Sequence, residues 1–188
     1  MERPVPASTP TPPRIAGIAI RPWAPDDAEA LNRAVAESRA HLRPFMPWAR
    51  HPLMSPAQRR EWFRSSAAAG DRLFGAWGGA GTVIGIVGLH PRVGRGGLEI
   101  GYWVHVDHVR RGVATAMVRA VIPHAFADPG VTFVEIRHDV ANVVSGRVPA
   151  GLGFTLLGTV AGSDEAPAET GVHRRWRLDR SAAASFVT

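Results

Sequence analysis

The segment from Gly101 to Thr115 places an apolar strand directly before a basic turn that contains glycine, and a helix directly after that turn. The first N–H groups of a helix have no partner within the helix, and they lie at the positive end of its dipole. Phosphate binds readily at such a helix start. Arg110 and Arg111 add positive charge, and Gly112 allows a ligand to approach the backbone. The turn is therefore a candidate phosphate site; an ordinary strand-to-helix turn with solvated arginines is the alternative.

A second segment, Asn142 to Phe154, follows another apolar strand, Val131 to Arg137. In this order the two segments resemble the GCN5-related N-acetyltransferases (GNAT), and within them the branch that acetylates ribosomal-protein N-termini (the RimJ/RimL type). The phosphate turn of that family is Gln/Arg-x-x-Gly-x-Gly/Ala, and its counterpart here is Val109-Arg110-Arg111-Gly112-Val113-Ala114. The later family element is Asn-x-x-Ser-x-Arg, a hydrophobic residue and then Leu-Gly-Phe; its counterparts are Asn142, Ser145, Arg147, Val148, Leu152, Gly153 and Phe154. The resemblance extends from about Ile18 to about Leu178.

The resemblance implies acetyl-CoA as donor and a primary amine as acceptor, joined in one ternary complex. The pyrophosphate would lie on the backbone N–H groups of the phosphate turn, formed by Arg110, Arg111, Gly112, Val113, Ala114 and Thr115. Val109 departs from the family's Gln/Arg, so one charge-assisted hydrogen bond is either missing or supplied by another group. The pantetheine arm would pair, as an added strand does, with the backbone of Val104, His105 and Val106. We expect the His105 and His108 side chains to be solvated or at the sheet edge.

The resemblance also implies a glutamate that deprotonates the amine through water, and Glu99 stands at the corresponding strand start. A strand-end surface glutamate is the alternative interpretation. An α-amine has a pKa of about 7.7–8.0, so part of it is already free base near neutrality. A lysine amine, at about 10.4, requires much more help. A weak base therefore fits an N-terminal acceptor better than a lysine.

Many relatives use a tyrosine of the last helix to protonate the departing CoA thiolate. The corresponding position, seven residues after Asn142, is Pro149, and the single tyrosine, Tyr102, lies elsewhere in the sequence. We therefore predict that the tyrosine acid is absent. The resemblance to the RimL type implies Ser145 in its place, donating its O–H toward the sulfur; a serine bonded to its own helix is the alternative. Asn142 either holds the pantetheine amide or caps the helix, and both roles are compatible.

Leu42 to Trp48 resembles the acceptor-side loop of the same branch. Phe45, Met46 and Trp48 would line the acceptor side, with the polar loop from Gly162 to Thr170 opposite them. Packing of these aromatic and methionine side chains within the protein is the alternative.

Composition limits the protein class. The chain has 188 residues, of which 45% are hydrophobic, and this suits one domain with a substantial core. With no cysteine, the chain excludes disulfides and thiolate metal sites, and we predict no bound metal. The net charge of +6 comes from scattered arginines without any lysine, a distribution that does not favour a nucleic-acid partner. Without a membrane-spanning apolar run or a signal-peptide core, the sequence suggests a cytoplasmic protein.

The order of elements predicts an α+β, GNAT-type fold: a mixed, mostly antiparallel central sheet, splayed at the cofactor site and flanked by helices. The expected strands are 17–23, 72–77, 82–89, 98–106, 131–137, 154–160 and 172–178, and the expected helices include 56–69 and 111–126. We predict a flexible leader at 1–13, a single domain at 14–180 and a C-terminal tail at 181–188.

The sequence therefore favours an N-acetyltransferase that acts on the α-amine of a protein or peptide. A small-molecule amine acetyltransferase, for an antibiotic or toxin, is the alternative within the same class; Asp164, Glu165 and Glu169 would favour a polycationic acceptor. A non-catalytic acyl-CoA sensor is the alternative from another class. A homodimer is compatible with the resemblance, while the acceptor and the length of the acyl group stay open.

Overall fold

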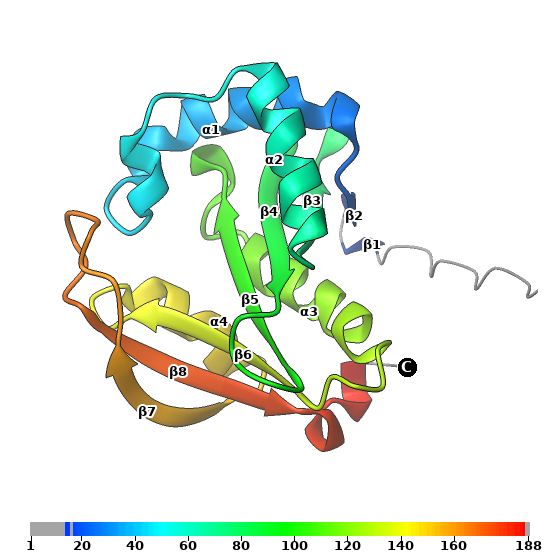
Figure 1. Ribbon diagram of the computed structural model, residues 1–188, viewed down its shortest axis with the longest axis vertical. Coiled ribbons are helices and arrows are strands. Elements are labelled where there is room, and N and C mark those ends of the chain that lie inside the picture. Colours follow the sequence, from blue (N-terminus) through cyan, green and yellow to red (C-terminus); the bar gives the residue numbers. More distant parts are fainter. Residues whose placement is uncertain (1–13, 16, 187–188) are drawn as a thin grey trace, which may run out of the picture.

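A computed structural model of the protein describes residues 14–15 and 17–186 (Figure 1). A single sheet runs through the molecule in the strand order β1-β2-β3-β4-β5-β6-β8-β7. Its strands are β1 (Arg14–Ile15), β2 (Ile18–Pro22), β3 (Arg72–Trp77), β4 (Val83–His90), β5 (Gly97–Val104), β6 (Phe133–Asp139), β7 (Thr155–Ala161) and β8 (Val172–Asp179). Neighbouring strands are antiparallel except for β5 and β6, which are parallel. The predicted α+β fold is confirmed.

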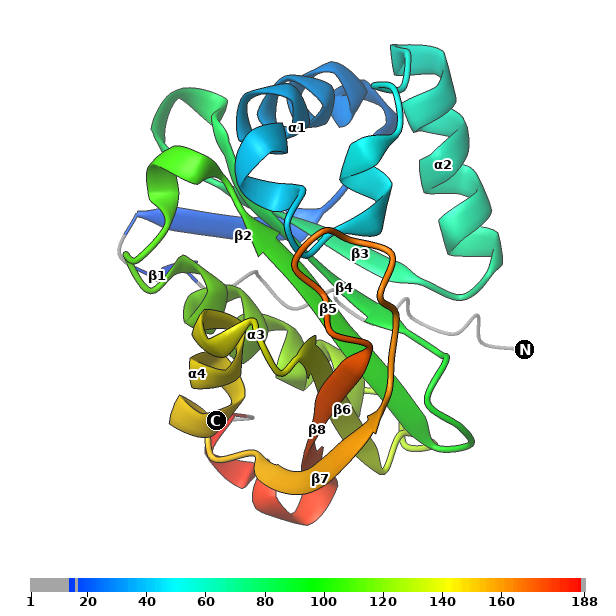
Figure 2. The same ribbon diagram turned by 90° about the vertical axis from the view of Figure 1, so that its left-hand side faces the viewer.

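Helices cover both faces of the sheet (Figure 2). On one face lie α1 (Ala28–Leu42) and α2 (Pro56–Ala68), and on the other lie α3 (Val113–Phe126) and α4 (Val143–Gly151). In α1 the buried residues recur at helical spacing: Ala28, Leu31, Ala34, Val35, Ser38 and Leu42. The start of α2 is fixed by a reciprocal capping box between Ser55 and Gln58. Each helical layer thus has its own hydrophobic core against the sheet.

The sheet opens between β5 and β6. Their pairing runs only from Gly97 opposite Phe133 to Glu99 opposite Glu135. Beyond Glu99, β5 continues to Val104 on β4 alone, while β6 continues on β8 alone. The two strands therefore diverge in a wedge whose vertex is at Glu99.

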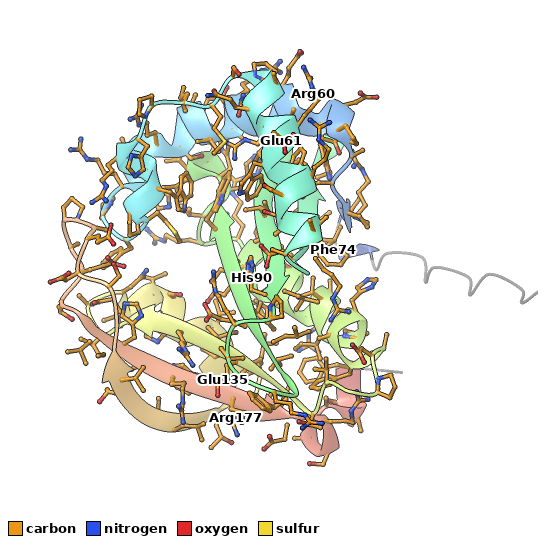
Figure 3. The ribbon with its side chains drawn as sticks, viewed as in Figure 1. Arg60, Glu61, Phe74, His90, Glu135 and Arg177 are labelled. Atoms are coloured by element: carbon orange, nitrogen blue, oxygen red, sulfur yellow. The ribbon has the colours of Figure 1, made fainter. Side chains whose placement is uncertain are left out.

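Charge pairs hold β6 to β8 on the face away from α4. Glu135 has only 1% of its surface exposed, and its carboxylate accepts a 2.7 Å hydrogen bond from Arg177 (Figure 3). Arg137 donates to the other carboxylate oxygen of Glu135 at 3.1 Å. A buried carboxylate needs such partners, because burial without them disfavours the charged form strongly.

Several boundaries differ from the sequence-based expectations. The strand expected to end at Val106 ends at Val104, and the helix expected from Arg111 begins at Val113. The expected C-terminal tail is in part packed on the domain, since Ala183 lies between two short 3-10 helices and is buried in the larger core. The expected leader, residues 1–13, lies outside the described residues. Within the described part of the chain, no helix is long and apolar enough to cross a membrane.

Candidate active site

The predicted phosphate turn lies at the N-terminus of α3. Gly112 precedes the helix with a φ of +76°, and Arg110, with a φ of +59°, is the only described non-glycine residue at positive φ. The first helical hydrogen bond joins the Ala116 N–H to the Gly112 carbonyl, so the N–H groups of residues 113–115 have no partner in the helix. Among the described residues, none accepts a hydrogen bond from the N–H groups of 110–112. The turn presents a row of unpaired donors suited to an anion.

The edge of β5 that faces the wedge also has free backbone groups. The His105 N–H bonds to the Ile84 carbonyl of β4 at 2.9 Å. In an antiparallel pair, alternate residues direct their N–H and C=O groups to opposite edges. The backbone groups of Tyr102 and Val104 therefore point away from β4, toward the gap where β6 has diverged.

Two of the three residues expected to pair with pantetheine do not offer a free N–H group. That of His105 is bound by Ile84, and that of Val106 donates to the Ser38 hydroxyl of α1 at 3.2 Å. We expected the His105 side chain to be solvated or at the sheet edge, but it is buried, with 3% exposure. Its Nδ1 accepts from the Asp107 N–H, so Nε2 carries the proton and donates to Glu37 at 2.9 Å. Of the three, Val104 alone keeps its backbone toward the wedge.

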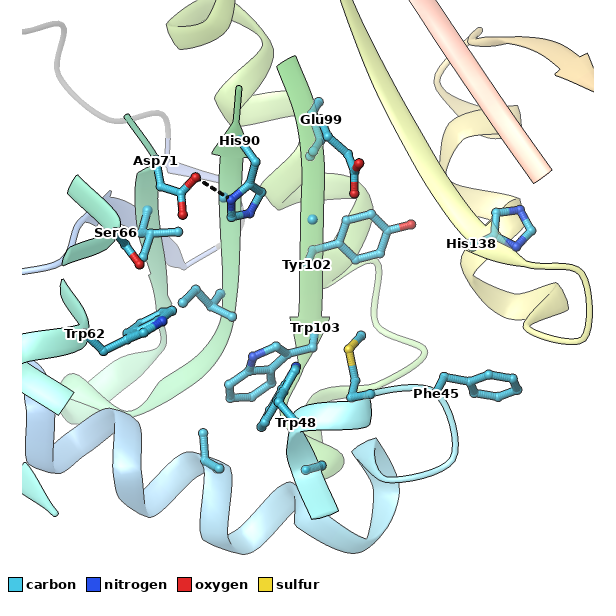
Figure 4. A pocket seen from close by; sticks show the side chains of 18 of the residues that line it. Phe45, Trp48, Trp62, Ser66, Asp71, His90, Glu99, Tyr102, Trp103 and His138 are labelled. Carbon is cyan, nitrogen blue, oxygen red and sulfur yellow. Dashed lines mark ion pairs between the residues drawn. The ribbon is translucent and has the colours of Figure 1, made fainter. Parts of the chain in front are cut away.

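Glu99 lies at the vertex of the wedge, with 14% of its side chain exposed. Its carboxylate accepts a 2.8 Å hydrogen bond from Arg92, which orients it. Directly across the sheet from Glu99 is His90 of β4, whose Nδ1 lies 2.9 Å from a carboxylate oxygen of Asp71 (Figure 4). A Cβ at Gly101 would be 3.4 Å from His90 Nε2, so the imidazole lies over this glycine, beside Glu99. His90 and Asp71 carried no signal in the sequence, because only the pairing of the strands brings them to Glu99.

Ser145 lies in the first turn of α4, on the other side of the wedge. The Asn142 side chain caps this helix by accepting from the Ser145 N–H at 3.2 Å, as one of the two expected roles requires. The tyrosine that the sequence placed elsewhere is in contact with this serine: the Tyr102 hydroxyl is 3.0 Å from the Ser145 hydroxyl and donates to the Ser145 carbonyl at 3.1 Å. Burial raises the pKa of Tyr102 to about 12, against the opposing effect of the hydrogen bond with Ser145. Tyr102 is far from the last helix in the sequence, but the fold brings its hydroxyl to Ser145.

The expected acceptor-side residues lie together near Trp103, on the face of the sheet that α1 covers. Phe45, Met46 and Trp48 line a cavity, and the Trp48 ring lies 6.3 Å from that of Trp103 of β5. The loop 162–170 closes over the same segment (Figure 2). Its Ala168 N–H donates to the Pro44 carbonyl at 2.9 Å.

One cavity of about 660 Å³ connects these parts (Figure 4). It runs from the segment 45–48 past Trp103 and Glu99 to Tyr102, Asn142 and Ser145. The phosphate turn is not among its lining residues. In the described part of the chain no group of three or more His, Asp or Glu side chains is arranged to hold a metal ion.

The acetyltransferase (GNAT) domain matches residues 18–155, well over half of the chain. The chain belongs to the GNAT acetyltransferase family. A candidate ribosomal N-acetyltransferase of Bacillus subtilis (strain 168), YdaF, is 31% identical over 146 residues, which are 73% of this chain and 77% of YdaF. Solved structures that share the fold include two with bound CoA. RimL, the ribosomal L7/L12 α-N-protein acetyltransferase, in complex with CoA, has a TM-score of 0.78 at 16% identity and covers 90% of this chain and 98% of its own. Mycobacterium smegmatis RimJ with a CoA disulfide has a TM-score of 0.76 at 23% identity and covers 89% of this chain and 84% of its own.

In this GNAT acetyltransferase, the residues predicted for catalysis and for acceptor binding line one cavity: Glu99, Ser145, Phe45, Met46 and Trp48. The residues predicted for the pyrophosphate form a separate, open turn at α3. Tyr102, His90 and Asp71 are additional lining residues that the sequence did not indicate. The family membership makes the chain an enzyme that uses acetyl-CoA.

Proposed function

We propose that this enzyme moves an acetyl group from acetyl-CoA to the N-terminal α-amine of a protein or peptide, which attacks the thioester directly while both substrates are bound. The observation that carries this proposal is the single cavity that leads from the segment 45–48 to the vertex of the wedge, next to Glu99 and Ser145. The likeness to YdaF supports a ribosomal protein as the acceptor.

The donor would bind along the turn and the wedge. The unpaired N–H groups of 110–115 and the dipole of α3 suit the pyrophosphate, and the exposed side chains of Arg110 and Arg111 add charge. The backbone of Val104 would pair with the pantetheine arm, joined by that of Tyr102. The cap leaves the side-chain NH₂ group of Asn142 as a donor for a pantetheine carbonyl.

Proton movements follow from the residues on either side of the wedge. As the amine nitrogen bonds to the acetyl carbon and the carbon–sulfur bond breaks, the amine loses a proton to the Glu99 carboxylate through water. Arg92 holds this carboxylate in place. The sulfur leaves as a thiolate, accepts a hydrogen bond from the Ser145 hydroxyl and takes up a proton from solvent after release.

The loop 162–170 supports an α-amine rather than a polycationic drug as acceptor. Of its three carboxylates, that of Glu165 pairs with Arg50 at 2.6 Å, and the Glu169 side chain is only 6% exposed. Asp164 alone is exposed without an ion pair among the described residues. A carboxylate cluster free to bind several positive charges is thus not formed there. The aromatic wall of Phe45 and Trp48 suits a peptide or another partly apolar amine.

Turnover with acetyl-CoA and a panel of peptides that differ in their first residues tests this proposal, with released thiol as the readout. The matched control is the same peptide with a blocked α-amine and an internal lysine. We expect thiol release with free α-amines and little with the blocked peptides. Equal rates with the blocked peptides would contradict the α-amine assignment. Tight CoA binding without turnover of any amine would indicate a sensor instead.

A further inference from the structure

The contact between Tyr102 and Ser145 depends on an irregularity in α4. In a regular helix, the N–H of residue 149 would bond to the carbonyl of residue 145. Residue 149 is a proline within the helix and has no N–H. The Tyr102 hydroxyl of β5 donates to the Ser145 carbonyl in its place, at 3.1 Å. A tyrosine from across the wedge therefore compensates for the bond that Pro149 removes.

The same phenol oxygen lies 3.0 Å from the Ser145 hydroxyl, and both side chains line the cavity. Each hydroxyl has one proton to donate. Both oxygens lie within hydrogen-bond reach of the phenol, so its one proton can be shared between the Ser145 carbonyl and the Ser145 hydroxyl oxygen as a bifurcated donor. In that arrangement the serine's own proton must point away from the phenol, and it can then be donated into the cavity that Ser145 lines. The phenol thus restricts the orientation of the serine O–H.

We propose that Tyr102 is a positioning residue that directs the Ser145 hydroxyl toward the departing sulfur, and that Pro149 keeps the phenol at this place by leaving the Ser145 carbonyl without a helical donor. This inference rests on the proposed function. The positioning role changes none of the bonds made or broken in the reaction. The carbon–nitrogen bond forms, the carbon–sulfur bond breaks, the amine proton goes to Glu99, and neither hydroxyl gives up its proton.

The acidity of the two groups explains why the phenol positions rather than protonates. A thiol has an ordinary pKa of about 8.5. Burial holds the pKa of Tyr102 at about 12, well above that of a thiol, so its transfer of a proton to the thiolate would be unfavourable. The phenol remains a neutral hydrogen-bond donor through the reaction.

A structural role alone is the competing explanation, and Pro149→Ala separates the two. This substitution supplies the N–H that the Ser145 carbonyl lacks, so it can replace the structural contribution of the phenol. It cannot orient the serine hydroxyl. In the Tyr102→Phe/Pro149→Ala double variant, the Ser145 carbonyl therefore has a helical hydrogen-bond donor, and only the phenolic hydroxyl is removed.

The experiment measures kcat, the KM for acetyl-CoA and the melting temperature of Tyr102→Phe, Pro149→Ala, their combination, Ser145→Ala and Tyr102→Phe/Ser145→Ala. We expect Tyr102→Phe to lower kcat roughly fivefold to tenfold, the contribution of one hydrogen bond, with little change in KM. Pro149→Ala should restore the melting temperature of Tyr102→Phe without restoring kcat. In the Ser145→Ala background, removal of the phenol should have no further effect on kcat.

Recovery of kcat in the Tyr102→Phe/Pro149→Ala variant, or a wild-type kcat for Tyr102→Phe, would overturn the positioning role and leave the proposed function intact. An additional loss of kcat on Tyr102→Phe in the Ser145→Ala background would show that the phenol acts without the serine and would also overturn it. If Tyr102→Phe alone does not fold, the double variant with Pro149→Ala gives the same comparison. A wild-type enzyme that turns over no amine would instead refute the proposed function, and the inference with it.

Discussion

At the scale of single residues, the proposed donor side of the site depends on backbone rather than on side chains. Gly112 has a positive φ, and a Cβ added to it would meet no atom within 4 Å. Packing therefore does not require glycine here. The position requires it for its conformation and for the open space in front of the unpaired N–H groups.

Gly112→Val should weaken acetyl-CoA binding at least tenfold, because a branched side chain would occupy the space of the phosphates and strain the turn. Gly81→Val is the matched control: Gly81 has a similar φ of +72° and is equally open, but it lies in the hairpin between β3 and β4. Calorimetric titration with acetyl-CoA measures both variants. Binding by Gly112→Val as tight as that of Gly81→Val would refute the phosphate assignment.

Glu99→Gln should lower kcat roughly tenfold to a hundredfold and leave the affinity for acetyl-CoA nearly unchanged, since glutamine keeps the shape but cannot accept a proton. The loss is moderate because an α-amine is already partly unprotonated near neutral pH. Glu61→Gln on the exposed surface of α2 is the control, as Glu61 pairs only with Arg64. If kcat of Glu99→Gln matched the wild type between about pH 6 and about pH 9, Glu99 would have no part in the proton transfer.

At the scale of elements, α4 is held at the wedge by contacts with β5 and β6. His138 of β6 is buried, donates from Nδ1 to the Asp139 carbonyl at 2.8 Å and accepts at Nε2 from the Trp176 indole at 3.1 Å. A Cβ at Gly146 of α4 would lie only 2.7 Å from His138 Nε2, so the helix rests closely on this ring. Burial, followed by repulsion from Arg174 and His173, lowers the pKa of His138, although its bond to Asp139 opposes this.

The lowered pKa of His138 predicts that acid weakens the fold. The neutral ring is favoured in the folded state, so the unfolded chain binds the proton at a higher pH than the folded protein does. The free energy of unfolding should therefore fall as the pH drops below 6.5, the pKa of the histidine in the unfolded chain. It should stop falling once the pH is below the pKa of His138 in the folded protein. Protonation would also set an N–H of the ring against the Trp176 N–H. Urea unfolding of the wild type and of His138→Gln from about pH 7.5 to about pH 5.5 measures the effect. An equally steep fall in His138→Gln would assign the acid sensitivity to other groups.

Local patterns predict the elements of this site better than its contacts. The turn at Gly112 and the cap at Asn142 follow from residue types at short spacing, and both lie where the sequence indicates. Tyr102 and Ser145 are 43 residues apart and meet only because β5 and α4 flank the same wedge. The sequence shows that Pro149 frees a carbonyl, but not which group across the wedge would bind it.

At the scale of the whole molecule, the two faces of the sheet carry the parts proposed for donor binding and for acceptor binding. The larger core, built around α3, supports the phosphate turn and α4, while the smaller core packs α1 and α2 against Trp77 and Trp103 on the other face. Two links close the proposed acceptor side: Arg50 with Glu165 at 2.6 Å, and Ala168 with Pro44 at 2.9 Å. The strand order and the helices on both faces agree with the family resemblance, but the closure of one loop on the other depends on contacts more than a hundred residues apart.

This division predicts that acceptor and donor binding can be altered separately. Trp48 is 39% exposed on the wall of the cavity, beside Trp103, whereas the turn at α3 does not line this cavity. Trp48→Ala should raise the KM for a peptide roughly tenfold, the effect of losing about 1.4 kcal/mol of aromatic contact, and leave the KM for acetyl-CoA within about twofold. Leu156→Ala is the control, because Leu156 is also an exposed apolar residue but lies on β7, outside the cavity. Steady-state kinetics with each substrate varied in turn separate the two constants. Equal rises in both would mean that Trp48 supports the fold of the whole site rather than the acceptor, and an unchanged peptide KM would place the acceptor elsewhere in the cavity.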